Sequence, residues 1–269
     1  MTGDTRVPMT VGEILAEPHV VGGNTAKLRV MIELQKRMAR HNSLRILDVG
    51  CVGLQPLQFW MQLLERYQFH LTGIDVSGID RARSLVLQRG WESKVTLIEG
   101  SGYNLTTLVA AGSFEIVVAT QVLEHIAHLT KFLRQVAAVL CQDGEAFFTI
   151  DSAHWRRRFE WRQPIRAMKD VVKKALSLVG NERHYDLPLF DSEIIAACGE
   201  VGLTVRTCRY YNMAPLKWLH NRLLADEVKN RFLQQWFHLE EFMNDVHPGA
   251  RRAREYFAGL YVHAYKSWG

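Results

Sequence analysis

The chain has 269 residues, 48% of them hydrophobic, which is enough to bury the core of one large domain. No apolar run approaches the roughly 20 residues that span a bilayer, so we expect a cytoplasmic protein without a membrane helix. The formal net charge is +5, and the segment from His154 to Arg183 holds nine Lys or Arg against three Asp or Glu, which favours one local anionic contact over a uniformly basic, nucleic-acid-binding surface.

Residues 44–150 alternate short apolar runs with segments of helical period, a pattern typical of βαβ units and a parallel sheet. The predicted strands are Leu44–Val49, His70–Val76, Lys94–Glu99, Phe114–Ala119 and Glu145–Ile150. The predicted helices between them run through Leu57–Leu64, Ser77–Gln88 and Leu129–Leu140.

The pattern breaks after the fifth strand, where an insert at about 154–188 replaces the expected short connection. Beyond it we expect a helix with Asp191 as its N-cap, strands at Leu203–Tyr210 and Tyr256–Tyr265, and a helical stretch over Lys217–Phe242. The sequence therefore predicts an α/β fold, a Rossmann-like, doubly wound, mostly parallel seven-stranded sheet with a helical insert. A helical segment at 1–43 would precede one domain at 44–269.

Four short segments end predicted strands and should face one crevice, because ligands bind beyond the carboxyl ends of the strands in such sheets. Gly50 and Gly53 lie in the turn after the first strand, where the lack of a Cβ lets backbone approach a ligand. Asp75 ends the second strand, 25 residues after Gly50, where a carboxylate can accept hydrogen bonds from both ribose hydroxyls. Ser101 and the segment 120–123 end the next two strands, and together the four segments outline a pocket for a nucleoside.

The sequence resembles the class I methyltransferase family, in particular its ubiquinone-biosynthesis-like and surface-glycan O-methyltransferases. The motifs are ILDVGC (46–51), GIDVS (73–77), FEIVVATQVLEHI (114–126) and LCQDGEAFFTI (140–150), in the family's order. The resemblance implies S-adenosylmethionine as the cofactor, with Asp75 on the ribose and Ser101 near the adenine. The residues expected to bind the cofactor are Asp48, Gly50, Cys51, Gly53, Asp75, Val76, Ser101, Gln121 and Val122.

Two segments depart from the family pattern. Val52 and Leu54 occupy glycine positions of the loop after the first strand, and Ser101 replaces a common acidic residue. The glycines of this loop could serve the turn alone, and Asp75 could cap a helix. Because of Val52, Leu54 and Ser101, a methyltransferase-like scaffold that has lost cofactor binding is one alternative to an enzyme.

The candidate general bases are three histidines, because the pKa of histidine lies near neutrality. They are His125 after the fourth strand, His154 beyond the fifth, and His184 at the end of the insert. For His125, a role in positioning its loop is an equal alternative.

The insert contains a basic amphipathic stretch at 154–180, in which arginines interleave with aromatic residues. It could be a lid over the domain, or it could attract an anionic or membrane-associated substrate by peripheral contact with a membrane. We expect a small-molecule, glycan or lipid-linked acceptor, and oxygen as the methylated atom follows from the resemblance alone. An RNA-directed methyltransferase is the alternative, but nucleic acid is disfavoured because Thr120-Gln121-Val122-Leu123 stands where base-methylating enzymes have an Asn/Asp-Pro-Pro-aromatic run.

The four cysteines form no CxxC pair and do not alternate with histidine at the spacing of metal ligands. They are Cys51, Cys141, Cys198 and Cys208. We therefore expect reduced thiols, with neither a zinc site nor a disulfide framework.

Overall fold

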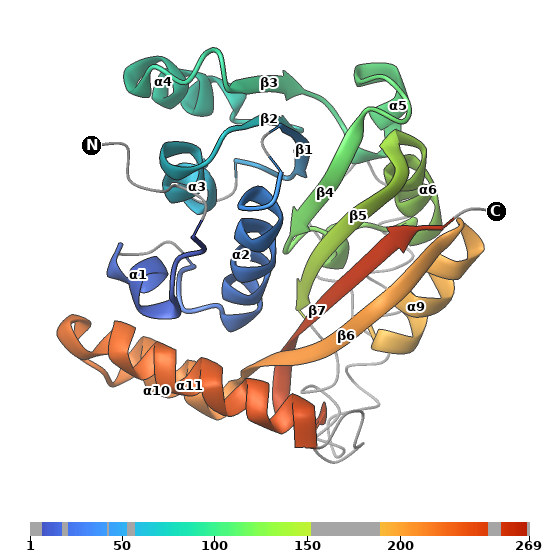
Figure 1. Ribbon diagram of the computed structural model, residues 1–269. Coiled ribbons are helices and arrows are strands. Elements are labelled where there is room, and N and C mark those ends of the chain that lie inside the picture. The colour runs from blue at the N-terminus through green and yellow to red at the C-terminus, as the bar shows by residue number, and fades with distance from the viewer. Residues whose placement is uncertain are drawn as a thin grey trace.

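The computed structural model describes residues 7–17, 21–41, 43–52, 57–151, 189–246 and 254–267. Seven strands form its central sheet: β1 (Leu44–Val49), β2 (Phe69–Asp75), β3 (Val95–Glu99), β4 (Phe114–Thr120), β5 (Leu140–Asp151), β6 (Leu203–Met213) and β7 (Phe257–Lys266). Their order across the sheet is β3-β2-β1-β4-β5-β7-β6, and β7 alone among them runs antiparallel to its neighbours (Figure 1). The predicted doubly wound, mostly parallel seven-stranded sheet is confirmed.

Helices cover both faces of this sheet. On one face the buried side chains come from α1 (Val11–Ala16), α2 (Thr25–Met38), η1 (Gln58–Trp60), α3 (Met61–Arg66), α4 (Ile79–Arg89) and α11 (Asp226–Val246). On the other they come from α5 (Leu105–Leu108), α6 (Leu129–Val139) and α9 (Asp191–Glu200). Along β4, Ile116 and Val118 face the first set and Val117 and Ala119 the second, which is the period of two expected for a strand buried on both faces.

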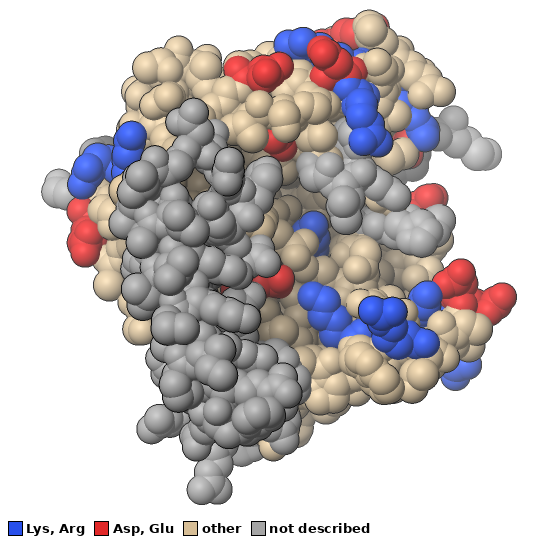
Figure 2. Space-filling model, turned by 180° about the vertical axis from the view of Figure 1, so that it is seen from behind, with Lys and Arg blue, Asp and Glu red and all other residues tan. Residues whose placement is uncertain are grey.

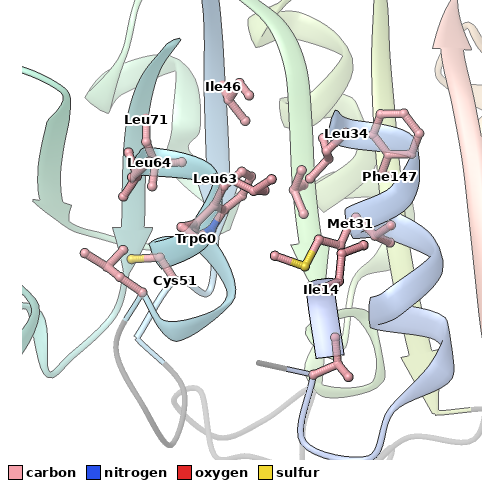
Figure 3. Close-up of a cluster of buried hydrophobic side chains, with 14 of the residues drawn as sticks. Ile14, Met31, Leu34, Ile46, Cys51, Trp60, Leu63, Leu64, Leu71 and Phe147 are labelled. Atoms are coloured by element: carbon pink, nitrogen blue, oxygen red, sulfur yellow. The ribbon is translucent and has the colours of Figure 1, made fainter. Parts of the chain in front are cut away.

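In the core on this face, α2 packs against β5, β6 and β7, and the side chains of η1 and α3 lie beside those of the first two strands (Figure 3). Trp60 is 1% exposed and lies among Ile46, Leu63 and Leu71. Burial of a side chain of this size contributes on the order of 2 to 3 kcal/mol to folding, and the indole N–H needs a polar partner in such surroundings. That partner is a carboxylate at the end of β1.

Several element boundaries differ from those predicted by the sequence. Strand β5 begins at Leu140, not Glu145, because Leu140 pairs with Phe114 before the register shifts at Ile116. The N-cap of α9 is Phe190, not Asp191, and its backbone N–H donates to Glu193 at 2.9 Å. The helical stretch expected over Lys217–Phe242 is two helices, α10 (Ala214–Arg222) and α11. Among the described helices, none combines the length and hydropathy of a membrane-crossing segment.

A buried polar network fastens the start of α2 to the end of β6 and to α11. Glu240 is fully buried and accepts hydrogen bonds from Thr25 Oγ1, from Trp236 Nε1 at 2.6 Å and from the Met213 backbone N–H at 2.6 Å. Asn212 has a left-handed φ of 58° and accepts from the Thr25 backbone N–H at 2.9 Å. Thr25 lies 187 residues from Asn212 and 215 from Glu240 along the chain. The network therefore joins a segment near the N-terminus to segments far along the sequence.

Burial raises the pKa of Glu240 from 4.5 to about 7, against the opposing effect of the hydrogen bonds from Thr25, Met213 and Trp236. A carboxyl group whose pKa is higher in the folded than in the unfolded state holds its proton more tightly when folded. Its ionisation therefore removes stability as the pH rises from about 4.5 to about 7.

We predict that Glu240→Gln stabilises the protein relative to wild type more at pH 8 than at pH 5, by up to about 3 kcal/mol. The neutral amide keeps a side-chain oxygen for Met213 and Trp236 and offers an N–H to Thr25. Thermal unfolding of both proteins from pH 5 to 8 measures the difference. Glu227→Gln, on an exposed position of the same helix, should show no such trend. A stability difference for Glu240→Gln that is constant with pH would contradict this account.

Candidate active site

The carboxyl ends of β1, β2 and β4 meet where the strand order reverses. Strand β1 pairs in parallel with β2 on one side and with β4 on the other. The connections that follow β1 and β4 therefore run in opposite directions across the sheet. Such a reversal opens a crevice beyond the strand ends. From behind, the molecule is hollowed at its centre, and both basic and acidic atoms are visible in the hollow (Figure 2).

Gly50 makes the bend that follows β1. Its φ is 83°, and its N–H donates to the Ile74 carbonyl at 2.8 Å, which ties the bend to β2. A Cβ on Gly50 would lie 2.5 Å from Cγ2 of Val122, in the loop after β4. The loops after β1 and β4 therefore touch at a point where only hydrogen fits.

Asp75, the last residue of β2, faces the loop after β1. Its Oδ2 accepts a hydrogen bond from the Val52 backbone N–H at 3.0 Å. Within the described part of the chain, Oδ1 accepts no hydrogen bond, and the side chain is half-buried. One carboxylate oxygen thus holds the loop, and the other can accept from a ligand.

Asp48 lies deeper, near the end of β1. It is 6% exposed, and its Oδ2 accepts from Trp60 Nε1 at 2.6 Å. Burial raises its pKa to about 7, while the Trp60 hydrogen bond and the positive charge of Lys27 oppose that rise. The Asp48 carboxyl group is therefore a weaker acid than an exposed aspartate.

Three more of the predicted residues surround these groups. Ser101 caps η2 (Gly102–Asn104), with its Oγ accepting from the Tyr103 N–H at 3.3 Å. Gln121 and Val122 are half-buried after β4, and Gln121 has a φ of 58° with its N–H donating to the Thr149 carbonyl at 2.8 Å.

Two of the predicted residues lie differently. Cys51 is buried in the core behind the loop, where its Sγ would lie 2.8 Å from a Cβ on Gly73, and burial raises the pKa of its thiol. Val76 is 41% exposed after β2.

Of the predicted histidine bases, His125 lies in η3 (Leu123–His125), and its backbone N–H donates to Val122. His154, His184, Gly53 and Leu54 lie outside the described residues, as does the basic stretch at 154–180. The described residues contain no group of three or more His, Cys, Asp or Glu that could hold a metal ion, and the four cysteines are free thiols.

Sequence reasoning did not single out four charged residues near the crevice: Lys27, Glu124, Asp151 and Lys217. Glu124 follows the end of β4 and Asp151 is the last residue of β5, so the strand-end argument could have found them. Lys27 and Lys217 lie on helices whose position depends on long-range contacts, and no local pattern marks them.

The sequence matches a family model described as a methyltransferase domain over residues 25–207, more than half of the chain.

Three solved structures share the fold. An S-adenosylmethionine-dependent methyltransferase from Methanosarcina mazei is 14% identical, with 85% of this chain and 95% of that chain covered at a TM-score of 0.56. Geranyl diphosphate C-methyltransferase from Streptomyces coelicolor A3(2) is 11% identical, with 94% and 87% covered at 0.55. The [4+2]-cyclase SpnF is 15% identical, with 90% and 81% covered at 0.55. Because this fold also serves a cyclase, the likeness to these structures establishes the architecture alone.

We predict that Gly50→Ala lowers the melting temperature several degrees more than Gly112→Ala. Both glycines have positive φ, which costs alanine about 1 to 2 kcal/mol, but a Cβ on Gly112 meets nothing within 4 Å. At Gly50 the added methyl must displace Val122, whose β-branched side chain has little rotamer freedom.

Thermal unfolding of the two variants tests this. Adding Val122→Ala to Gly50→Ala should restore part of the lost melting temperature. If Gly50→Ala and Gly112→Ala lower the melting temperature equally, the loops do not touch.

Proposed function

Because the chain belongs to the methyltransferase family, whose methyl donor is S-adenosylmethionine, we propose that the crevice at Gly50, Asp75 and Val122 binds this donor and transfers its methyl group to an oxygen of a small-molecule, glycan or lipid-linked acceptor. The single observation that carries the proposal is the junction of Asp75 with the bend after β1. This junction places a carboxylate beside a glycine at the switch point of the sheet.

The ribose end is supported by Asp75. A charged carboxylate is a strong acceptor for two neighbouring hydroxyl groups, and the Oδ1 of Asp75 is open to such donors while Oδ2 keeps its bond to Val52. Hydrogen bonds to a charged group contribute about 1.5 to 3 kcal/mol each.

The methionine end is supported by Gly50 and Asp48. The glycine bend leaves backbone exposed where any side chain would collide with Val122. Asp48 lies in the same turn and offers a carboxyl group that gains or loses its proton near pH 7. In its ionised form, the Asp48 carboxylate can pair with the ammonium group of an amino-acid tail.

The adenine end is supported less directly. The Ser101 hydroxyl already accepts from the Tyr103 N–H, so any hydrogen bond to the adenine amine shares this oxygen. An acidic residue at this position would have offered more acceptor capacity. We therefore expect the ribose contact to contribute more to donor affinity than the adenine contact.

When bound, S-adenosylmethionine supplies a methyl group attached to a positively charged sulfur. A nucleophile can attack this methyl carbon, and the sulfur leaves as a neutral thioether. The chain's own part is to hold the acceptor atom in line with that methyl group and to keep bulk water out. Holding two reactants in line removes much of the entropic barrier of a bimolecular reaction. Oxygen as the acceptor atom is supported by the resemblance of residues 46–51 and 114–126 to O-methyltransferases.

We predict that Asp75→Asn weakens binding of S-adenosylhomocysteine, the product of the donor, by 10- to 100-fold without a large loss of stability. The asparagine oxygen can still accept from the Val52 N–H, but the negative charge that attracts the ribose hydroxyls is lost. Isothermal titration calorimetry measures the affinity.

Asp80→Asn is the matched control. Its side chain is 91% exposed on the first turn of α4, paired with Arg83, and we expect no change in affinity. Two results would reject the proposal: no heat on addition of the donor at millimolar concentration, as a scaffold would behave, or equal affinities for wild type and Asp75→Asn.

A further inference from the structure

Beside the proposed donor site lies a second set of charged residues. Lys27, in the first turn of α2, interacts electrostatically with Asp48 near the end of β1, Glu124 after β4, Asp151 at the end of β5 and Lys217 on α10. In the view of Figure 2, basic atoms also gather at the lower right, over α10 and the start of α11. Because β5 lies beyond β4 as seen from β1 and β2, Glu124 and Asp151 are on the side of the crevice away from Asp75, and Lys27 lies between them and Asp48 in charge interaction with both sides.

The segment that leads into α2 touches α10, and these two helices carry the two lysines. Asn24 caps α2 by accepting from the Lys27 backbone N–H at 3.1 Å. A Cβ on Gly23 would lie 2.9 Å from the imidazole of His220, one turn after Lys217 on α10. The buried network of Thr25, Asn212 and Glu240 fixes α2 against the strand that leads into α10, so both lysines have defined positions.

The ammonium groups of both lysines lack partners in the described part of the chain. Lys27 is half-buried and makes no hydrogen bond or ion pair there, and neither does Lys217. By contrast, Arg29 and Arg37 on the same helix have carboxylate partners at 2.8 and 2.7 Å. Burial lowers the pKa of Lys27, and the repulsion from Lys217 adds to this, while three carboxylates oppose it. A half-buried ammonium group without a hydrogen-bond acceptor costs free energy, which a bound anion would recover.

This set of charged residues also includes carboxylates. Glu124 is 3% exposed, and its Oε1 accepts from the Asp151 backbone N–H at 3.4 Å. The Oδ1 atom of Asp151 is buried and has no hydrogen-bond partner. An acceptor oxygen of this kind is expected to be satisfied in a working complex.

We infer that Lys27 and Lys217 bind an anionic group of the methyl acceptor, and that Asp151 accepts the hydrogen bond of its nucleophile. The acceptor is then a small hydroxy or amino compound that carries a carboxylate or a phosphate. This inference rests on the proposed function. In the transfer, a lone pair of the nucleophile forms the bond to the methyl carbon, the carbon–sulfur bond breaks with its electron pair on sulfur, and the nucleophile's proton passes to the Asp151 carboxylate.

The test uses the full chain saturated with S-adenosylhomocysteine, titrated calorimetrically with inorganic phosphate and, in a separate arm, with malonate. The two arms distinguish a phosphate from a carboxylate. We expect at least one anion to bind. Its affinity should fall at least tenfold in Lys27→Met and in Lys217→Met, and Lys27→Arg should retain it because the charge remains.

Lys36→Met is the matched control, because Lys36 lies on the same helix, away from the crevice, and pairs with Glu33 at 3.0 Å. It should leave anion binding unchanged. Asp151→Asn removes a negative charge near the lysines. The affinity for the anion should therefore stay the same or rise about twofold.

The inference is overturned if neither anion binds the complex, or if Asp151→Asn weakens the anion. It is also overturned if Lys27→Met leaves anion binding intact and instead weakens S-adenosylhomocysteine tenfold, since Lys27 would then belong to the donor. Failure of the proposed function looks different, because wild type itself would then not bind S-adenosylhomocysteine.

Discussion

The close contact between the loops after β1 and β4 is the constraint on which the rest of the site depends. Gly50 can turn with positive φ and lie against Val122 only because it has no side chain, and this contact draws the two loops together. The bend is held from the other side by its hydrogen bond to Ile74 and by the bond from Val52 to Asp75. Three strand ends are thereby fixed around one point, so a ligand there meets preformed groups and less free energy is lost to ordering the protein on binding.

The helical cover of this crevice depends on a second, buried interaction. Glu240 and Asn212 bind the start of α2 from a distance of about 200 residues along the chain, and this brings Lys27 and Lys217 toward the strand ends. A buried network of this kind tolerates few substitutions, because each polar atom left without its partner is costly. The proposed donor and acceptor sides of the crevice thus have separate supports, the glycine bend for one and the buried network for the other.

The sheet and the donor side could be predicted from the sequence because their signals are local. Apolar runs of strand length end in Asp48, Asp75 and Thr120, and parallel order places those ends together. The proposed acceptor side could not be predicted, because the positions of Lys27 and Lys217 follow from contacts between distant segments. The burial that raises the pKa of Asp48 was equally hidden, since it depends on Trp60 and the core around it. Leu140 was assigned to a helix by its apolar period, but pairing with Phe114 places it in β5.

The central claim is that the crevice between β1, β2 and β4 holds the methyl donor, and a crystal structure of the chain with S-adenosylhomocysteine tests it most directly. The account predicts both ribose hydroxyls within hydrogen-bonding distance of the Asp75 carboxylate and the amino-acid tail against the backbone of Gly50. A product molecule bound elsewhere on the protein, or a ribose that does not contact Asp75, would contradict it.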